Sequence, residues 1–193
     1  ASDGAAVAIV INQADATVNV NGYTGVYDTA YHGATGSATG VGGVSVGMLN
    51  LGATFKNVPG GMAHWTFEGG ANYLDEQGYV AINILARHIT GRFTAADKIY
   101  DGNVSATVLT RSLIGVLGTD VVNLTGGTAK FASKNVGTWT VTLTSATLTG
   151  VDAGNYALDS VATTTAKITP KALTGSATTQ SALNIAKDGT VSF

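Results

Sequence analysis

The sequence of 193 residues contains no cysteine. This absence excludes disulfide bonds, zinc sites built from thiolates, and cysteine nucleophiles from the chemistry of the chain. Small extracellular domains often use disulfides, but a chain that is exported unfolded from a bacterium gains from having no thiols.

Charge is also scarce, since charged residues make up 11% of the chain and the formal net charge is -2. A typical soluble domain has about a quarter of its residues charged. Without a basic surplus there is no electrostatic case for binding nucleic acid. The sequence has neither a run of about 18 apolar residues nor a signal peptide. We therefore expect a soluble fragment without membrane insertion, with any targeting signal outside it.

Proline is rare at 2 residues, whereas glycine is abundant at 26, and threonine and valine recur throughout. Glycine supplies tight turns, and threonine and valine suit pleated strands. Short segments alternate apolar and polar residues, as in AHWTFEGG and TWTVTLTSATLTG. This period of two predicts strands with one wet face, and it predicts that Trp65 and Trp139 are buried. Two segments, ANYLDEQG and SLIGVLGTD, have the composition for a single helical turn each.

One junction sequence occurs three times, as VAIVINQADATV, VAINILARHITG and TTAKITPKALTG. Repetition at domain spacing predicts an array of similar units. We expect a first module at 1–86, with the last strand of a preceding unit at 1–11, and a second module at 87–173. Residues 174–193 are expected to start a following unit or to form a C-terminal extension. A short hinge is predicted at about Leu85–His88.

Two family resemblances follow from longer motifs. Residues 12–86, with GYTGVYDTAYHGATGSATGV and AHWTFEGGANYLDEQGYVAINI, resemble the MBG domain, which is mostly β and rich in glycine. They depart from its pattern at Asp28-Thr29, where Asp-Gly is expected. Residues 88–173 resemble the YDG domain at KIYDGNVSATV, KNVG and DAGNY. The resemblance implies an all-β fold of two tandem Ig-like antiparallel β-sandwich modules joined by a short hinge.

Motif residues have simple structural interpretations. A tyrosine with a buried ring and a hydroxyl bonded to backbone commonly locks a corner of a β-sandwich. Asp28, Asp101 and Asp152 fit acceptors of Asx turns, with following glycines free to take positive φ. The residues to which we assign structural roles are Tyr27, Trp65, Tyr73, Tyr100, Asp101, Gly102, Trp139, Asn155 and Tyr156.

The sequence gives only weak support for a catalytic, metal-binding or cross-linking site. We expect no enzyme, because no pair of carboxylates lies in a recognisable cleft. His32, His64 and His88 lack the close spacing of a zinc motif, so no cofactor or metal is expected. Calcium at a module junction stays an alternative, with oxygen ligands from Asp75-Glu76, from Asp97 with Asp101, or from Asp152 with Asn155. A Lys–Asn isopeptide has candidates by residue type only: Lys98, Lys130 and Lys134.

The families that these modules resemble occur in tandem in large bacterial surface proteins, including haemagglutinin-like adhesins. The resemblance implies an extracellular spacer on the bacterial cell surface that displays a distal binding domain. The expected partners are neighbouring repeat modules of the same chain. The rival interpretation is a glycan-binding module, for host or environmental glycans, that uses exposed aromatics of the first module. Its candidate contacts are Tyr23, Tyr31 and Tyr79.

Overall fold

The computed structural model describes residues 10–173. This range is mostly β-strand with curled sheets and no α-helix, and two 3-10 turns, η1 (Val41–Gly43) and η2 (Ala153–Asn155), interrupt the strands. Neither ANYLDEQG nor SLIGVLGTD, the two segments with the composition for a helical turn, contains helix, and each combines strand with turn and irregular residues. The unit expected at 174–193 lies outside the described residues. Most of the strand expected at 1–11 does too, and Val10 and Ile11 are exposed and outside any strand.

The first module contains a two-stranded sheet, β1–β3, and a four-stranded sheet in the order β2–β6–β5–β4. Pairing is antiparallel except between β2 and β6, which run parallel. Its strands are β1 (Thr17–Asn21), β2 (Tyr23–Val26), β3 (Thr35–Thr39), β4 (Met48–Asn50), β5 (Gly60–Glu68) and β6 (Glu76–Leu85).

The second module contains a three-stranded sheet, β12–β7–β9, and a four-stranded sheet, β10–β11–β13–β8. Two of its pairs, β12 with β7 and β13 with β8, are parallel. The strands are β7 (Arg87–Ala95), β8 (Lys98–Ile99), β9 (Val108–Ile114), β10 (Asn123–Phe131), β11 (Gly137–Thr149), β12 (Tyr156–Val161) and β13 (Thr164–Thr169). Most strand pairs are antiparallel, as expected from sequence, and the parallel pairs depart from that expectation. The chain enters each module at one end and leaves at the other, so an early strand and the last strand run in the same direction.

A hydrophobic core lies between the two sheets of the second module. Phe93 of β7 contributes from one sheet, and Phe131, Val141 and Ile168 contribute from the other. Along β11 the inward residues Val141 and Leu143 are buried, while the threonines between them are exposed. This is the alternation that the sequence predicts, and it fixes which face of the sheet meets the core.

Both tryptophans are only partly buried, which differs from the expectation of buried side chains. Trp65 lies on the inward row of β5 between buried residues, and its ring extends beside Gly78 of β6, where a Cβ would come within 2.8 Å of it. Trp139 packs at the margin of the second core, and its indole N–H donates to the Asn135 carbonyl at 2.7 Å. An indole is large and carries a polar N–H, so a partly wet position at the end of a core is usual.

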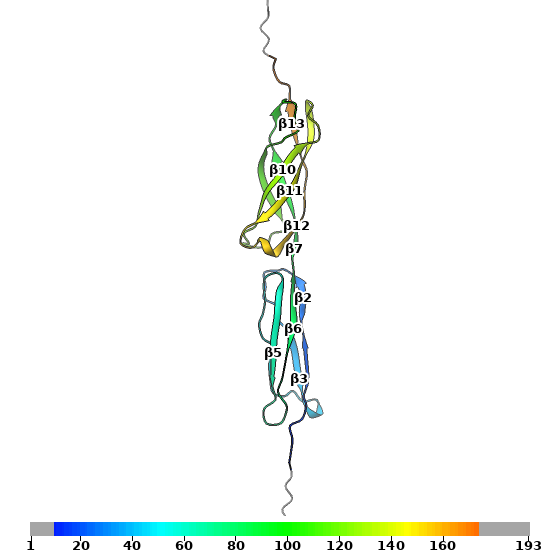
Figure 1. Ribbon diagram of the computed structural model, residues 1–193, viewed down its shortest axis with the longest axis vertical. Coiled ribbons are helices and arrows are strands. Elements are labelled where there is room, and N and C mark those ends of the chain that lie inside the picture. The colour runs from blue at the N-terminus through cyan, green and yellow to red at the C-terminus, as the bar shows by residue number, and fades with distance from the viewer. Residues whose placement is uncertain (1–9, 174–193) are drawn as a thin grey trace, which may run out of the picture.

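The two modules stack end to end, and the described chain begins at one end of the long axis and leaves at the other (Figure 1). Only Ala86 separates β6 from β7. A single hydrophobic cluster crosses this boundary, because Tyr27 and Ile84 of the first module pack with Ile89 and Tyr156 of the second. The short hinge predicted at about Leu85–His88 thus coincides with a packed junction.

Candidate functional site: the module junction and the distal tip

A carboxylate of the second module joins the two modules at the junction. Tyr27 directly follows β2 and donates its hydroxyl to Asp120 Oδ2 at 2.9 Å. Tyr156 begins β12 and donates its hydroxyl to the same oxygen at 2.6 Å, while it accepts the Leu117 N–H at 3.0 Å. The Tyr27 and Tyr156 rings meet edge to face with centroids 5.5 Å apart. Both rings are buried, and the two bonds to Asp120 are partly buried.

Burial also keeps the two hydroxyls protonated. Desolvation raises the pKa of Tyr27 well above its ordinary value, and the hydrogen bond to Asp120 raises it further. The pKa of Tyr156 is raised by the same two causes in the same order. Ionisation of either tyrosine would remove the proton donated to Asp120 and would place a phenolate beside its carboxylate, which is unfavourable. At neutral pH both tyrosines are therefore donors, and the three-residue link is intact.

A second polar contact crosses the junction at Asn155, which is 6% exposed. Its side-chain oxygen accepts the Val58 N–H at 3.0 Å, and its side-chain nitrogen donates to Asn57 Oδ1 at 3.2 Å. In the described range no buried side-chain nitrogen or oxygen lacks a hydrogen-bond partner. Asn155 therefore bonds a first-module loop from the second module, and its position is set by partners on both sides.

Asp152 lies three residues before Asn155 and plays a local role. Its carboxylate accepts the Val121 N–H at 2.8 Å, and its carbonyl accepts the Asn155 N–H at 3.0 Å. The carboxylate contact is not the Asx turn expected at this position, because its partner lies in another loop. Asp152 thus ties the loop that carries Asp120 to the turn that carries Asn155.

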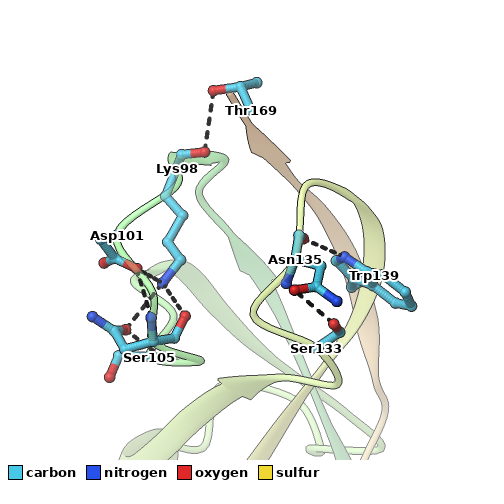
Figure 2. Close-up of polar contacts among 8 residues, drawn as sticks. Lys98, Asp101, Ser105, Ser133, Asn135, Trp139 and Thr169 are labelled. Atoms are coloured by element: carbon cyan, nitrogen blue, oxygen red, sulfur yellow. Dashed lines mark hydrogen bonds and ion pairs between the residues drawn. The ribbon is translucent and has the colours of Figure 1, made fainter. Parts of the chain in front are cut away.

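The opposite end of the second module, which we call the distal tip, carries Tyr100, Asp101 and Gly102, and Figure 2 shows Lys98 and Asp101 there. Lys98 Nζ donates to Asp101 Oδ1 at 2.8 Å and to the carbonyl and side-chain oxygens of Asn103 at 2.8 and 3.0 Å. Asp101 Oδ1 also accepts the Asn103 N–H at 3.1 Å, which is an Asx turn, and Gly102 has φ +80°. The hydrogen bond from Lys98 lowers the pKa of Asp101 most, and the bond from the Asn103 N–H lowers it further.

Beside this loop the distal tip has a shallow hollow. Its volume is about 490 Å³, and it is lined by Tyr100, Asn135, Val136, Pro170, Lys171 and Leu173. The wall at Asn135 is fixed by two bonds, from its N–H to Ser133 Oγ and from the Trp139 indole to its carbonyl (Figure 2). The Tyr100 N–H donates to the Thr169 carbonyl at 2.8 Å and holds the start of the loop to β13.

The remaining tyrosines of the first module are spread over its surface. Tyr73 accepts the Val41 N–H on its hydroxyl at 3.1 Å. Tyr23 stacks flat on the His32 ring at 4.0 Å and is partly buried. Tyr31 and Tyr79 are 71% and 68% exposed, and the Tyr79 ring lies 4.7 Å from that of His64. Of the three candidate glycan contacts, only Tyr31 and Tyr79 present their rings to solvent.

The Asp28-Thr29 step forms a turn of the same kind as the one at Asp101. Asp28 Oδ1 accepts the Ala30 N–H and bonds His32 Nε2, both at 2.9 Å. The hydrogen bond with His32 lowers the pKa of Asp28 most, and the bond from the Ala30 N–H lowers it further. Thr29 has φ +72°, although it is not a glycine. The threonine thus takes the left-handed conformation that Gly102 takes in the second module.

Sequence reasoning missed Asp120. Its signal is weak, because it is the one charged residue in the apolar segment 112–122 and belongs to no short motif. The partners Asn57 and Val58 were missed as well, since nothing in sequence relates them to a residue about a hundred positions away.

No group of three or more His, Cys, Asp or Glu gathers as a metal site among residues 10–173. Two of the carboxylates considered for calcium accept backbone hydrogen bonds. Asp75 accepts the Gly69 N–H, and Asp97 accepts the Lys167 N–H. His88 pairs with Asp159, and His64 with Gln77. In the same range no helix is long and apolar enough to cross a membrane.

Comparison with known families matches residues 87–166 to the YDG domain. Comparisons with curated proteins and with solved structures each found no match. The matched stretch begins with β7 and ends within β13, and it contains both sheets of the second module. The range predicted from sequence, 88–173, runs further at its C-terminal end. The chain thus contains a YDG domain, which spans residues 87–166.

Proposed function

We propose that this chain is a non-catalytic spacer of a bacterial surface adhesin, in which tandem β-modules extend the protein and display a distal binding domain. In this proposal the first module is an MBG domain, both modules are Ig-like sandwiches, and the protein acts outside the cell. The partners of each module are its neighbours in the chain. The YDG domain and the end-to-end stacking of the modules support this function.

The observation that carries the proposal is the packed junction. Bending the modules apart separates Tyr27 from Asp120 and Val58 from Asn155, and it opens the shared hydrophobic cluster. A hydrogen bond to a charged group contributes about 1.5–3 kcal/mol, and an unpaired buried partner costs a similar amount. The junction therefore resists bending, and length accumulates by repetition of modules.

Distance measurements between the two ends test the proposal. Because the chain has no cysteine, two introduced cysteines can carry spin labels without background. Glu68→Cys at the end of β5 and Lys134→Cys at the distal tip place the labels at opposite ends. We expect one long, narrow distance distribution. Adding Asp120→Ala should broaden it, while adding Asp159→Ala, an exposed carboxylate of the same module, should not. A short distance in the parent chain would contradict an extended spacer.

Glycan binding is the second candidate, because two exposed aromatic rings, Tyr31 and Tyr79, lie on the first module. An exposed ring face can stack on a sugar. A glycan array tests this with Tyr31→Ala and Tyr79→Ala, and Tyr100→Ala in the second module serves as the matched control. Binding that is lost only in the first-module variants would favour the glycan-binding module. An array without any bound glycan would reject it.

A further inference from the structure

Tyr27 and Tyr100 occupy equivalent positions in their modules. Tyr27 follows β2, which runs parallel to the last strand of its module, and its N–H donates to the Leu85 carbonyl at 2.9 Å. Tyr100 follows β8, which runs parallel to the last strand of the second module, and its N–H donates to the Thr169 carbonyl at 2.8 Å. Each tyrosine is followed by an aspartate that closes an Asx turn. Both therefore mark the end of a module from which the chain departs.

The surroundings of the two tyrosines differ. Tyr27 is 1% exposed, because Tyr156 and Asp120 of the next module lie against it. Tyr100 is 37% exposed and borders the hollow of the distal tip. The distal tip thus has a tyrosine in the position that is covered at the junction, and it presents this tyrosine to solvent.

The chain leaves both modules with a related sequence. Residues 84–91 read ILARHITG, and residues 168–175 read ITPKALTG. In this correspondence Ile89, which is 2% exposed in the junction cluster, matches Leu173, which is 95% exposed beside the hollow. Arg87, whose guanidinium donates to the Gly115 carbonyl of the second module, matches Lys171.

We propose that the distal tip is the docking surface for a further β-module of the same polypeptide, which enters through Leu173. That module brings a carboxylate and a tyrosine hydroxyl to Tyr100, as the second module brings Asp120 and Tyr156 to Tyr27. Leu173 becomes buried against the hollow, and Lys171 donates to a carbonyl of the incoming module. The partner is thus defined by its chemistry: an apolar base with one acidic and one tyrosine side chain. This inference rests on the proposed spacer function and names the partner of its free end.

The base of the second module fits this description. Its partly buried apolar side chains Val116, Leu117 and Val122 belong to the junction cluster, and Asp120 lies among them. The distal tip offers Val136, Pro170 and Leu173 as apolar partners and Lys171 as a cation. Both surfaces therefore carry apolar side chains, and their charges have opposite signs, so a copy of the second module is a suitable probe.

The test is an extended chain in which residues 174–193 are replaced by a second copy of residues 90–173 that carries Tyr100→Phe, so that the Tyr100 peptide comes from the first copy alone. Leu173 then takes the place of Ile89 at the new boundary. Nitration of tyrosine, followed peptide by peptide by mass spectrometry, reports exposure at each site. We expect nitration of Tyr100 to fall about tenfold relative to the parent chain, because docking makes its exposure depend on local opening. Changing Asp120→Ala in the appended copy alone should restore it.

Three results separate the outcomes. Unchanged nitration of Tyr100 would overturn the proposal if the appended copy is folded. Slow hydrogen exchange in the copy's own peptide that carries Tyr100→Phe, which covers most of its β9, shows that it is folded. Concentration-dependent protection of Tyr100 in the parent chain would also overturn it, because a second copy would then be the occupant. Protection of Tyr100 together with a bent particle would leave the docking surface standing and would reject only the spacer function.

A second variant covers the case in which the appended copy fails to fold. Replacing residues 84–91 of the parent chain by the sequence of 168–175 places the distal sequence in the existing junction. If the two departure segments are equivalent, Tyr27 stays as unreactive as in the parent. If Tyr27 becomes as reactive as Tyr100, the correspondence on which the docking surface rests is wrong.

Discussion

Tyr27 and Tyr156 belong to different modules, yet both donate a hydrogen bond to the same oxygen of Asp120, at 2.9 and 2.6 Å. Neither ring has appreciable contact with water. The orientation of one module on the other is therefore encoded in specific donors and one shared acceptor as well as in apolar packing. Directional bonds of this kind select one geometry, whereas apolar contacts alone tolerate sliding.

Removal of this acceptor should destabilise the junction. Asp120→Ala leaves two buried hydroxyls without their partner, and we expect the free energy of unfolding to fall by about 2–4 kcal/mol. Asp120→Asn retains one carbonyl acceptor and should cost less. Urea denaturation measures both. Asp159→Ala is the matched control, since its exposed pair with His88 contributes little. Equal effects of Asp120→Ala and Asp159→Ala would show that the shared acceptor is unimportant.

Alkaline pH should open the same junction. The folded-state pKa values of Tyr27 and Tyr156 lie above the ordinary 10.0. Their contribution to stability is therefore complete below about pH 10 and is lost as the pH rises from there through the folded-state values. Phenolate absorbance and urea denaturation, measured together across this range, should show late ionisation of buried tyrosines and falling stability.

The matched variants for this experiment remove one hydroxyl each. Tyr27→Phe and Tyr156→Phe should each reduce the late-ionising component of the titration. Tyr79→Phe, which alters an exposed ring away from the junction, is the matched control. If the late component survives in both junction variants, the buried hydroxyls are not its source.

Much of the second module could be predicted from its sequence. The alternation of Val141 and Leu143 with threonines fixes the inward face of β11, and the Asx turn at Asp101 follows from the chemistry of Asp-Gly. These features depend on neighbours in the chain. The degree of burial of Trp139 does not, because it depends on where the sheet ends, which no local pattern records.

The junction could not be predicted either, because its contacts join residues that are far apart in the sequence. Tyr27 and Asp120 are separated by 93 residues, and nothing in the sequence around Asp120 or Asn57 relates either residue to its partner. The repeated sequence around Ile84 indicated a boundary between modules, but a short polar segment between two strands is equally typical of a hinge and of a packed joint. Only the positions of loops from both modules distinguish these cases.

Truncating a side chain should cost more stability at the centre of the second module's hydrophobic core than at its margin. Phe131 is 3% exposed in the centre of the second core, so Phe131→Ala should cost about 3–5 kcal/mol. Trp139→Ala should cost less, about 2 kcal/mol, because part of its ring already contacts water. Urea denaturation gives both values, and iodide should quench the fluorescence of native Trp139 only partly. Equal costs would place Trp139 in the core after all.

The turn at Thr29 offers a stabilising substitution. A residue with a Cβ pays about 1–2 kcal/mol to adopt the left-handed conformation, and Thr29 has φ +72°. Glycine adopts this conformation freely but loses more backbone entropy on folding, about 0.5–1 kcal/mol. Thr29→Gly should therefore raise the free energy of unfolding by about 0.5–1 kcal/mol.

The reverse change in the second module is its matched control. Gly102 has φ +80°, and a Cβ placed there meets no atom of the described residues within 4 Å. Gly102→Thr should therefore lower stability by about 1 kcal/mol through backbone conformation alone. Thermal unfolding of both variants beside the parent chain tests the pair. A loss of stability in Thr29→Gly would mean that contacts of the threonine side chain outweigh the relief of its backbone, and the two turns would then not be energetically equivalent.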